Sequence, residues 1–342
     1  MKLKKKYKQL IIFLLKKYFG EIGLQDFDKH NIKSIIILAP ELYGDIILLT
    51  PLLKNLRTVC PSAEIIVAGV TDIIKILESD KNINRVYNIK KLSGNDKKTF
   101  FSQEFDLLYN TKDHPSTTFI YFSRRIKATH RVAINHPLHA GHYNHLISVK
   151  ESIEKIRVNC MLLPYLVPGI NLDRLRPYMP DGPISHNIEN FIKLIQGKNI
   201  VGINLSVSRK YRQWKLANWI YVLEKINHPV VVIATKEDQK KKQILEKMIP
   251  NVLSSPATKT IFDAARLISH LKLLITPDTA LIHIASCYNV PVIALYRWER
   301  DIKQFPPLSG KKKIILAAGK DINSIPADTV VSVFFELIDE IE

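Results

Sequence analysis

Cysteine is scarce in this sequence, and no long hydrophobic run is present. The three cysteines, Cys60, Cys160 and Cys287, lie far apart without metal-ligand or redox spacing, which favours a reducing cytoplasm as the setting. The apolar stretch at residues 10–15 is too short to span a bilayer. A signal peptide would need a longer apolar region and a small-residue cleavage site, and neither is present.

Acidic residues are also scarce, with 32 against 50 lysines and arginines, which gives a formal net charge of +18. Such a charge makes nucleic acid, an anionic membrane and an anionic substrate candidate partners. No RNA- or DNA-binding signature accompanies the charge, and aromatic residues are not interleaved with arginine as in a base-stacking surface. We therefore predict that nucleic acid is not a partner.

The excess charge is concentrated at the N-terminus, where seven lysines and no acids fall within the first 19 residues. Apolar residues at helical spacing predict a basic amphipathic helix over residues 1–24. These residues are Leu3, Tyr7, Leu10, Ile11, Leu14, Leu15, Tyr18 and Phe19. We predict peripheral contact of this helix with the anionic inner face of the cytoplasmic membrane. The alternative is a helix docked on the rest of the protein, with solvated lysines.

The rest of the chain alternates short apolar runs with helical patterns, which predicts an α/β fold with doubly wound parallel sheets. A length of 342 residues with 46% hydrophobic content leaves room for two domains. We place a helix and lead-in at residues 1–30, a Rossmann-like domain at 31–168, a proline-rich linker at 169–183 and a second Rossmann-like domain at 184–342. The ligand is expected in a cleft between the domains, beyond the carboxyl ends of the strands.

Four further predictions concern single elements. Residues 46–61 follow one helical pattern with a proline in its early turns, and residues 71–80 form a helix capped by Thr71. Residues 251–255 are predicted as a short strand. The final helix, residues 328–342, begins with Asp328 or Thr329 as its cap.

The stretch at residues 271–297 is the centre of the predicted site. An apolar run ends before Asp278 and Thr279, and a helical pattern begins at Ala280. Such a turn directs backbone N–H groups and the positive end of the helix at a ligand, best matched by a phosphate or pyrophosphate. Thr279 adds a hydroxyl, and His283 lies about one helical turn along. Alternatively, Asp278 and Thr279 only cap the helix, and His283 is a half-buried histidine with satisfied hydrogen bonds.

Two other loops at predicted strand ends carry useful groups. Gly44 permits close backbone approach beside Tyr43, and Asp45 begins a helix, either as a base for an attacking hydroxyl or as a charge favoured by the helix dipole. The second loop offers hydroxyls and cations for neutralising phosphate, or is simply a solvated basic loop. Its candidate residues are Ser206, Ser208, Arg209 and Arg212.

Histidines and carboxylates elsewhere suggest weaker sites. Asp113 and His114 follow a predicted strand, and we place them with Tyr43 and Gly44 on the acceptor side. Four histidines at a constant spacing of three form a metal candidate: His136, His139, His142 and His145. The proline and glycine among them argue against one continuous helix, so we favour a polar loop lining the cleft. The Asp-x-Asp at residues 26–28 precedes the first strand and is poorly placed for a metal–diphosphate site.

Together, the three loops suggest transfer of a group from a diphosphate carrier. In this order they resemble the glycosyltransferase family 9 heptosyltransferases, the lipopolysaccharide core enzymes, over residues 33–300. IIILAPELYGDIILLTPLLKNLRTVCPSAEIIVAG is similar to the family's opening strand, Gly-Asp turn and helix with a Thr-Pro start. NLSVSRKYRQWKLANW is similar to its strand and basic loop ending in tryptophan. TPDTALIHIASCYNVPVIALY is similar to its Asp-Thr-Gly-x-x-His signature.

This resemblance implies a GT-B fold, with two Rossmann-like domains facing across a cleft. It also implies inverting transfer, without a metal or other cofactor, from a nucleotide-activated heptose, usually ADP-heptose, to an anionic glycolipid. Asp45 matches the family's proposed catalytic base. The residues matched to the donor are Ser208, Arg212, Asp278, Thr279 and His283.

The sequence departs from the family pattern in several places. Ala280 replaces the signature glycine, and Arg212 replaces a frequent lysine, which keeps the charge but changes its geometry. Residues 39–43 replace a serine-rich turn, and residues 235–238 replace a glycine-rich one. Two alternatives stay open: a catalytically inactive nucleotide-sugar or polyanion-binding protein of the same fold, and a GT-B sugar-nucleotide epimerase, which would need no acceptor.

Overall fold

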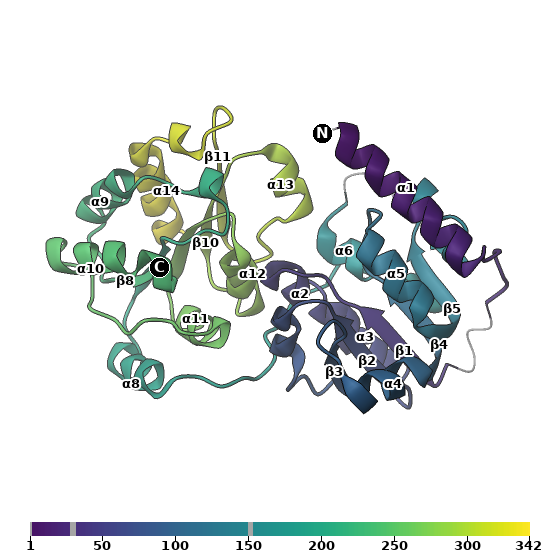
Figure 1. The fold of residues 1–342 in the computed structure, drawn as a ribbon. Coiled ribbons are helices and arrows are strands. Elements are labelled where there is room, and N and C mark those ends of the chain that lie inside the picture. The colour runs from purple at the N-terminus through teal and green to yellow at the C-terminus, as the bar shows by residue number, and fades with distance from the viewer. Residues whose placement is uncertain (1, 28–31, 150–152) are drawn as a thin grey trace. The chain divides into compact units, whose positions relative to one another are not determined.

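The computed structural model describes residues 2–27, 32–149 and 153–342 (Figure 1). The chain divides into two compact units, Met1–Leu175 (unit 1) and Arg176–Glu342 (unit 2). Each unit is built on one parallel sheet with helices around it. The predicted α/β fold with two doubly wound sheets is therefore confirmed.

Unit 1 contains a six-stranded sheet in the order β3-β2-β1-β4-β5-β6, which is the strand order of the Rossmann fold. The strands are β1 Ser34–Leu38, β2 Glu64–Gly69, β3 Arg85–Asn88, β4 Glu104–Asn110, β5 Lys127–Ile134 and β6 His145–Ile147. Residues 35–38 of β1 are at most 1% exposed, because both faces of a parallel sheet are covered. The strand order reverses between β1 and β4, and Asp45 and Asp113 lie in the segments that follow these strands.

Helices in unit 1 are mostly short. They are α1 Lys2–Phe19, α2 Tyr43–Ile47, α3 Thr50–Val59, α4 Gly94–Ser102, α5 Thr117–Arg125, α6 Lys155–Asn159 and α7 Leu162–Leu166, with 3₁₀ turns η1 Asp72–Leu77 and η2 Pro137–His139.

Unit 2 contains a five-stranded parallel sheet in the order β11-β10-β9-β7-β8. The strands are β7 Val201–Asn204, β8 Val230–Ile233, β9 Leu273–Pro277, β10 Val292–Tyr296 and β11 Lys312–Leu316. The strand order reverses between β7 and β9, which is the place where doubly wound sheets bind their ligands.

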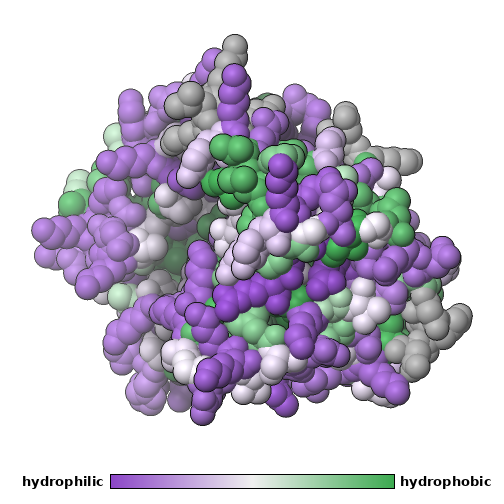
Figure 2. Space-filling view, turned by 45° about the vertical axis from the view of Figure 1, so that its right-hand side comes forward, coloured by the Kyte–Doolittle hydropathy of each residue, from purple (hydrophilic) through white to green (hydrophobic). Residues whose placement is uncertain are grey.

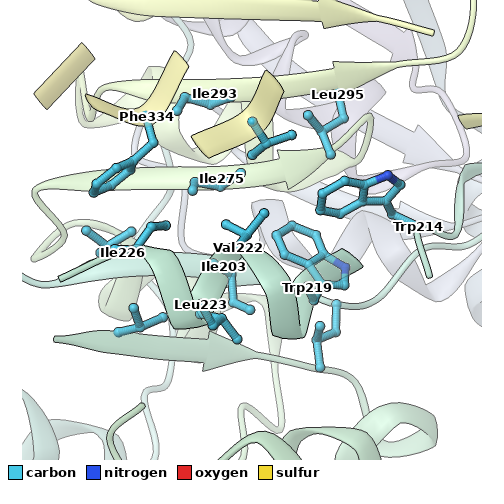
Figure 3. Packing of buried hydrophobic residues seen from close by; sticks show 14 of the residues in the cluster. Ile203, Trp214, Trp219, Val222, Leu223, Ile226, Ile275, Ile293, Leu295 and Phe334 are labelled. Atoms are coloured by element: carbon cyan, nitrogen blue, oxygen red, sulfur yellow. The ribbon is translucent and has the colours of Figure 1, made fainter. Parts of the chain in front are cut away.

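The helices of unit 2 cover a core rich in aliphatic residues. They are α8 His186–Ile195, α9 Leu216–Lys225, α10 Gln239–Met248, α11 Ile261–Ile268, α12 Ala280–Cys287, α13 Glu299–Gln304 and α14 Ala327–Asp339, with 3₁₀ turns η3 Lys210–Arg212, η4 Lys236–Asp238 and η5 Ile322–Ser324. Figure 3 shows Val222 of α9 pointing toward Ile203 and Ile275 of the sheet, beside Trp214 and Trp219. The two tryptophan rings meet edge to face, 4.9 Å apart, and both are 1% exposed. They hold the end of the basic loop against the core.

The N-terminal helix α1 is docked on unit 1 beside α5 (Figure 1). Ile12 is 3% exposed and belongs to the unit 1 core. Arg124 of α5 donates hydrogen bonds to the carbonyl oxygens of Phe19, at 2.8 Å, and Gly20, at 2.9 Å. The prediction of an amphipathic helix is correct, and so is the alternative that it docks on the protein.

Several local predictions are wrong. The single helix predicted over residues 46–61 is divided into α2 and α3. Pro51 has no N–H to donate to the carbonyl oxygen of Ile47, four residues earlier, and its ring would clash with that carbonyl. The Thr50 hydroxyl donates to that Ile47 carbonyl, at 2.8 Å. Residues 71–80 contain the 3₁₀ turn η1 rather than an α-helix, and the Thr71 side chain makes no capping hydrogen bond.

Two further corrections concern unit 2. Residues 251–255 form no strand, and Val252 makes only an isolated bridge with Val230. Pro326 occupies the N-cap position of the final helix without a side-chain capping hydrogen bond, and Asp328 lies in the first turn, where it accepts a hydrogen bond from Tyr221.

Hydrophilic side chains dominate the face of the molecule in Figure 2, with small groups of apolar residues among them. No helix in the described residues has both the length and the apolar content to cross a membrane.

Candidate functional site

The turn between β9 and α12 is fixed by hydroxyl and amide groups at the strand ends. Asn204, at the end of β7, donates from Nδ2 to the hydroxyls of Thr276, at 2.9 Å, and Thr279, at 3.2 Å. The Thr279 hydroxyl also accepts a hydrogen bond from the Leu281 N–H, at 3.3 Å, and so caps α12. The predicted strand, turn and helix are present, and the N-terminus of α12 lies at the reversal point of the sheet. That end of the helix attracts anions.

Arg212 binds Asp278, the first residue of this turn. Its Nη2 lies 2.7 Å from Asp278 Oδ2 and 3.5 Å from Asp301 Oδ2, and its Nη1 donates to the Asp278 carbonyl oxygen at 3.1 Å. Burial raises the pKa of Asp278 to about 6, the nearby Asp301 charge adds to that rise, and Arg212 opposes it. Asp278 therefore orients Arg212 and does not cap the helix. The Arg212 Nε is buried and has no hydrogen-bond partner among the described residues.

His283 lies inside unit 2. It is 4% exposed, and burial lowers its pKa to about 4, so the imidazole is neutral. Its Nδ1 makes no hydrogen bond within the described part of the chain, and an unpartnered buried nitrogen costs free energy. The alternative of a half-buried histidine with satisfied hydrogen bonds is therefore wrong. Ala280, the first residue of α12, is partly exposed.

The basic loop divides into a buried part and an exposed part. Ser206 is 7% exposed, and its hydroxyl donates to Asp238 at 2.8 Å and accepts from the Thr235 N–H at 2.8 Å. This hydroxyl links the loop to η4 and is already occupied. Ser208 and Arg209 are exposed ahead of η3. The structure thus brings Arg212 to Asp278 and Thr279, and it keeps the Ser206 hydroxyl in a separate network.

In unit 1, Asp45 occupies the first turn of α2, directly after β1. Burial raises the pKa of Asp45, and the charges of Lys155 and Lys112 oppose that rise. Lys112 pairs with Glu41 at 3.1 Å, and both lysines are less than a tenth exposed. Burial and the two lysine charges thus act on the pKa of Asp45 in opposite directions. Such opposing influences are typical of carboxylates that act as general bases.

The two acceptor-side candidates of the β4 loop belong to this group. Asp113 pairs with Lys155 at 3.2 Å and with His114 Nδ1 at 2.9 Å. Burial alone raises the pKa of Asp113, but His114 and Lys155 more than offset it, so this carboxyl stays ionised. Tyr43 and Gly44 form the start of α2 beside Asp45.

The sequence analysis missed Lys112 and Lys155. Lys112 could have been found, because it directly follows β4 at the same sheet edge as Asp45. Lys155 begins a five-residue helix whose pattern is too short to recognise.

The four spaced histidines do not gather around one point. His139 is fully buried and its Nδ1 contacts the Ile134 carbonyl oxygen at 2.8 Å, while His145 lies 3.0 Å from His130 and 2.9 Å from the Tyr165 hydroxyl. The prediction of a polar loop lining a cleft is wrong for His139, His142 and His145, which are buried. Nowhere in residues 2–27, 32–149 and 153–342 do three histidine, cysteine or acidic residues come close enough to hold a metal ion. Asp28 of the Asp-x-Asp lies outside the described residues.

Comparison with known proteins gives a consistent result. Residues 96–325 match the sequence model of Glycosyltransferase family 9 (heptosyltransferase). The chain is 24% identical over 278 residues to Lipopolysaccharide heptosyltransferase 3 of Escherichia coli, which covers 74% of this chain and 80% of that protein. The matched family range does not include Asp45.

Solved structures share the fold. A family 9 glycosyl transferase from Veillonella parvula superposes with a TM-score of 0.71 at 16% identity, over 92% of this chain and 99% of that one. The heptosyltransferase WaaC of E. coli, solved with ADP, gives a TM-score of 0.69 at 14% identity, over 89% of this chain and 99% of that one.

Proposed function

Because the chain belongs to glycosyltransferase family 9 and is a glycosyltransferase of GT-B fold, we propose that it transfers a heptose from ADP-heptose to a lipopolysaccharide or related lipid-linked saccharide, with inversion. Binding of the donor to unit 2 is supported mainly by the hydrogen-bond network of Asn204, Thr276 and Thr279. This network fixes the N-terminus of α12 at the reversal point of the unit 2 sheet. The E. coli relative that was solved with ADP has this fold.

Leaving-group stabilisation is assigned to unit 2. Transfer of the sugar leaves negative charge on the diphosphate, and Arg212 with the first N–H groups of α12 offers positive charge to it. The free Arg212 Nε and the unpartnered His283 Nδ1 supply further hydrogen-bonding capacity at this end of the sheet. Since these charges are built in, we propose that no metal ion is needed.

Activation of the acceptor is assigned to unit 1. Asp45 takes the proton of the attacking hydroxyl, and the charges of Lys155 and Lys112 limit the rise that burial causes in its pKa. The raised pKa makes Asp45 a stronger base than an exposed aspartate.

Contact with an anionic membrane surface is proposed for α1. While Ile12 packs into unit 1, apolar side chains elsewhere on the helix stay exposed: Tyr7 67%, Leu10 53%, Phe13 51%, Leu14 52% and Tyr18 80%. Residues 7, 10, 14 and 18 follow helical spacing, so they share a face other than the docked one. Lysines flank this face, and α1 contains no acid. An apolar stripe with only basic neighbours suits an interface of anionic lipid, which also holds a lipid-linked acceptor at the cytoplasmic side.

The donor is tested by calorimetry with ADP, UDP, GDP and CMP, without added metal. We expect selective binding of ADP. Selective binding of another nucleotide would mean that the donor carries that nucleotide instead of ADP, while the chain would still be a glycosyltransferase. If none of the four binds, the proposed donor site is wrong.

A further inference from the structure

Tyr211 and Trp298 hold two arginines at the strand ends of unit 2. Tyr211 lies in η3 after β7, Trp298 follows β10, and their ring centroids are 5.4 Å apart. The Arg297 guanidinium lies over both rings, 4.2 Å from Trp298 and 4.9 Å from Tyr211, and Arg300 lies 4.4 Å from Trp298. We name these four residues the aromatic–arginine cluster.

The carboxylates near this cluster are mostly engaged with other partners. Asp278 and Asp301 face Arg212, and Asp301 is also 3.5 Å from Arg300 Nε. Within the described residues no carboxylate lies within ion-pairing distance of Arg297, whose Nε donates to the Lys320 carbonyl oxygen. Asp321 is near enough for the charge of Arg297 to help lower its pKa, but its hydrogen bonds come from Asn323. Gathered like charges repel one another unless an anion joins them, so the cluster has unused capacity for negative charge.

The geometry fits a phosphoryl group. A guanidinium over an aromatic ring can still present its terminal Nη1 and Nη2 groups, and these can bind two phosphate oxygens at once. In Arg297 only Nε is used, by the Lys320 carbonyl oxygen. The stacking also restricts the side chain, so less rotamer freedom is lost when an anion binds. The cluster lies at the carboxyl ends of β7 and β10, the edge of the sheet at which ligands bind.

We propose that Arg297 and Arg300, held by Trp298 and Tyr211, bind a phosphoryl group of a substrate. Under the proposed function, on which this identification of the ligand rests, the group comes from the donor diphosphate or from a phosphate on the acceptor saccharide. Arg300 shares Asp301 with Arg212, whereas Arg297 makes no ion pair with Asp278 or Asp301, so Arg297→Gln is the substitution that separates this pair of arginines from Arg212 and the α12 turn.

Tryptophan fluorescence of the full chain measures this binding directly. The chain has three tryptophans, and Trp214 and Trp219 are each 1% exposed, so Trp298 is the one that a ligand reaches. Titration with inorganic pyrophosphate should change the emission with saturation in the wild type. In Trp298→Phe the signal should vanish while calorimetry still detects binding, because phenylalanine retains a ring face.

Arg297→Gln and Arg300→Gln should each weaken pyrophosphate binding by about tenfold. The matched control is Lys225→Gln, which removes a cation 5.7 Å above Tyr221 on α9, and it should leave the affinity unchanged. If Arg297→Gln and Arg300→Gln bind pyrophosphate as tightly as Lys225→Gln and the wild type do, the proposal is overturned. Unchanged unfolding midpoints identify the loss as one of binding and not of folding.

Titrations with ADP and inorganic phosphate distinguish the two sources. If the arginine substitutions weaken ADP binding in parallel with pyrophosphate binding, the group belongs to the donor. If they weaken binding of pyrophosphate and inorganic phosphate but leave ADP binding unchanged, it belongs to the acceptor. Pyrophosphate binding does not depend on turnover, so failure of the proposed transfer reaction would not contradict binding at the cluster. Failure of pyrophosphate binding at the cluster would likewise not contradict the transfer reaction.

Discussion

At the scale of single residues, the site is organised by paired charges rather than by isolated groups. Arg212 and Asp278 were both predicted as donor residues, yet their mutual contact and the role of Asp301 were not. The reason is physical: a sequence shows which charges follow a strand, but not which of them meet after folding. Ser206 illustrates the same limit, since its hydroxyl is used by Asp238.

Arg212→Gln is expected to lower the free energy of unfolding by about 3 kcal/mol, because it leaves the buried Asp278 without its cation and Asp301 with Arg300 alone. Adding Asp278→Asn should recover part of that loss, with a coupling of about 1–3 kcal/mol in urea unfolding. Arg85→Gln, which removes an exposed partner 3.6 Å from Glu64, is the control and should have little effect. Strict additivity of the two substitutions would contradict the pairing.

Lys155→Met should move the acid limb of the pH–rate profile to higher pH. The charge of Lys155 is the largest influence that lowers the pKa of Asp45, so its loss raises that pKa and the base ionises later. The measurement is kcat/KM against pH. Lys127→Met, which removes a lysine from an exposed pair with Glu104, serves as the control. If the acid limb of Lys155→Met does not shift, Asp45 is not the general base.

At the scale of elements, most strands and helices could be predicted, because buried parallel strands are continuous apolar runs and helices alternate with them. The failures have local causes. Pro51 divides one helical pattern into two, and β11 begins with charged residues because it is an edge strand. One face of α1 packs on unit 1 and another apolar face stays exposed. Helical spacing alone does not reveal this, because it depends on tertiary packing.

The cap of α12 can be tested with a conservative pair of variants. Thr279→Val keeps the shape but removes the hydroxyl, so it should cost about 0.5–2 kcal/mol of unfolding free energy and weaken ADP binding. Thr279→Ser retains the hydroxyl and should restore most of both. Equal behaviour of the two variants in calorimetry would show that the Thr279 hydroxyl is not what fixes this turn.

The exposed face of α1 is tested by Leu10→Glu combined with Leu14→Glu. Both side chains are more than half exposed, so the variant should fold while losing sedimentation with vesicles of anionic phospholipid. Ile244→Glu, at an exposed apolar position of α10, should sediment like the wild type. Undiminished sedimentation of the α1 variant would contradict the membrane proposal. Point substitutions are preferable to deletion of residues 1–24, because Ile12 belongs to the core.

At the scale of the whole molecule, histidine burial ties stability to pH. Burial lowers the pKa of His139, His142, His145 and His283 from 6.5 to about 4. The unfolded chain binds these protons at higher pH than the folded chain does. Their contribution is therefore fully present above pH 6.5 and is lost as the pH falls toward 4, while the raised pKa of Asp278 acts in the opposite direction.

Urea midpoints between pH 7.5 and 4.5 should show this fall. His142→Gln should flatten it, since one buried imidazole no longer titrates, and His186→Gln, at an exposed position, should not. An equal slope in both variants would assign the pH dependence to other groups.

The two-unit α/β architecture could be predicted from the alternation of patterns, and the family resemblance agreed with it. The approach of Lys155 to Asp45 and of Tyr211 to Arg297 and Trp298 could not, since each of these joins segments that are distant in sequence. The central claim, heptosyl transfer with Asp45 as base, is tested most directly by mixing the purified chain with ADP-heptose and a lipid-linked saccharide and measuring ADP release and product mass. We predict a heptose-bearing acceptor, ADP release only when acceptor is present, and a rate at least about 100-fold lower in Asp45→Asn. ADP release at the same rate without acceptor, or an Asp45→Asn variant as fast as the wild type, would contradict the account.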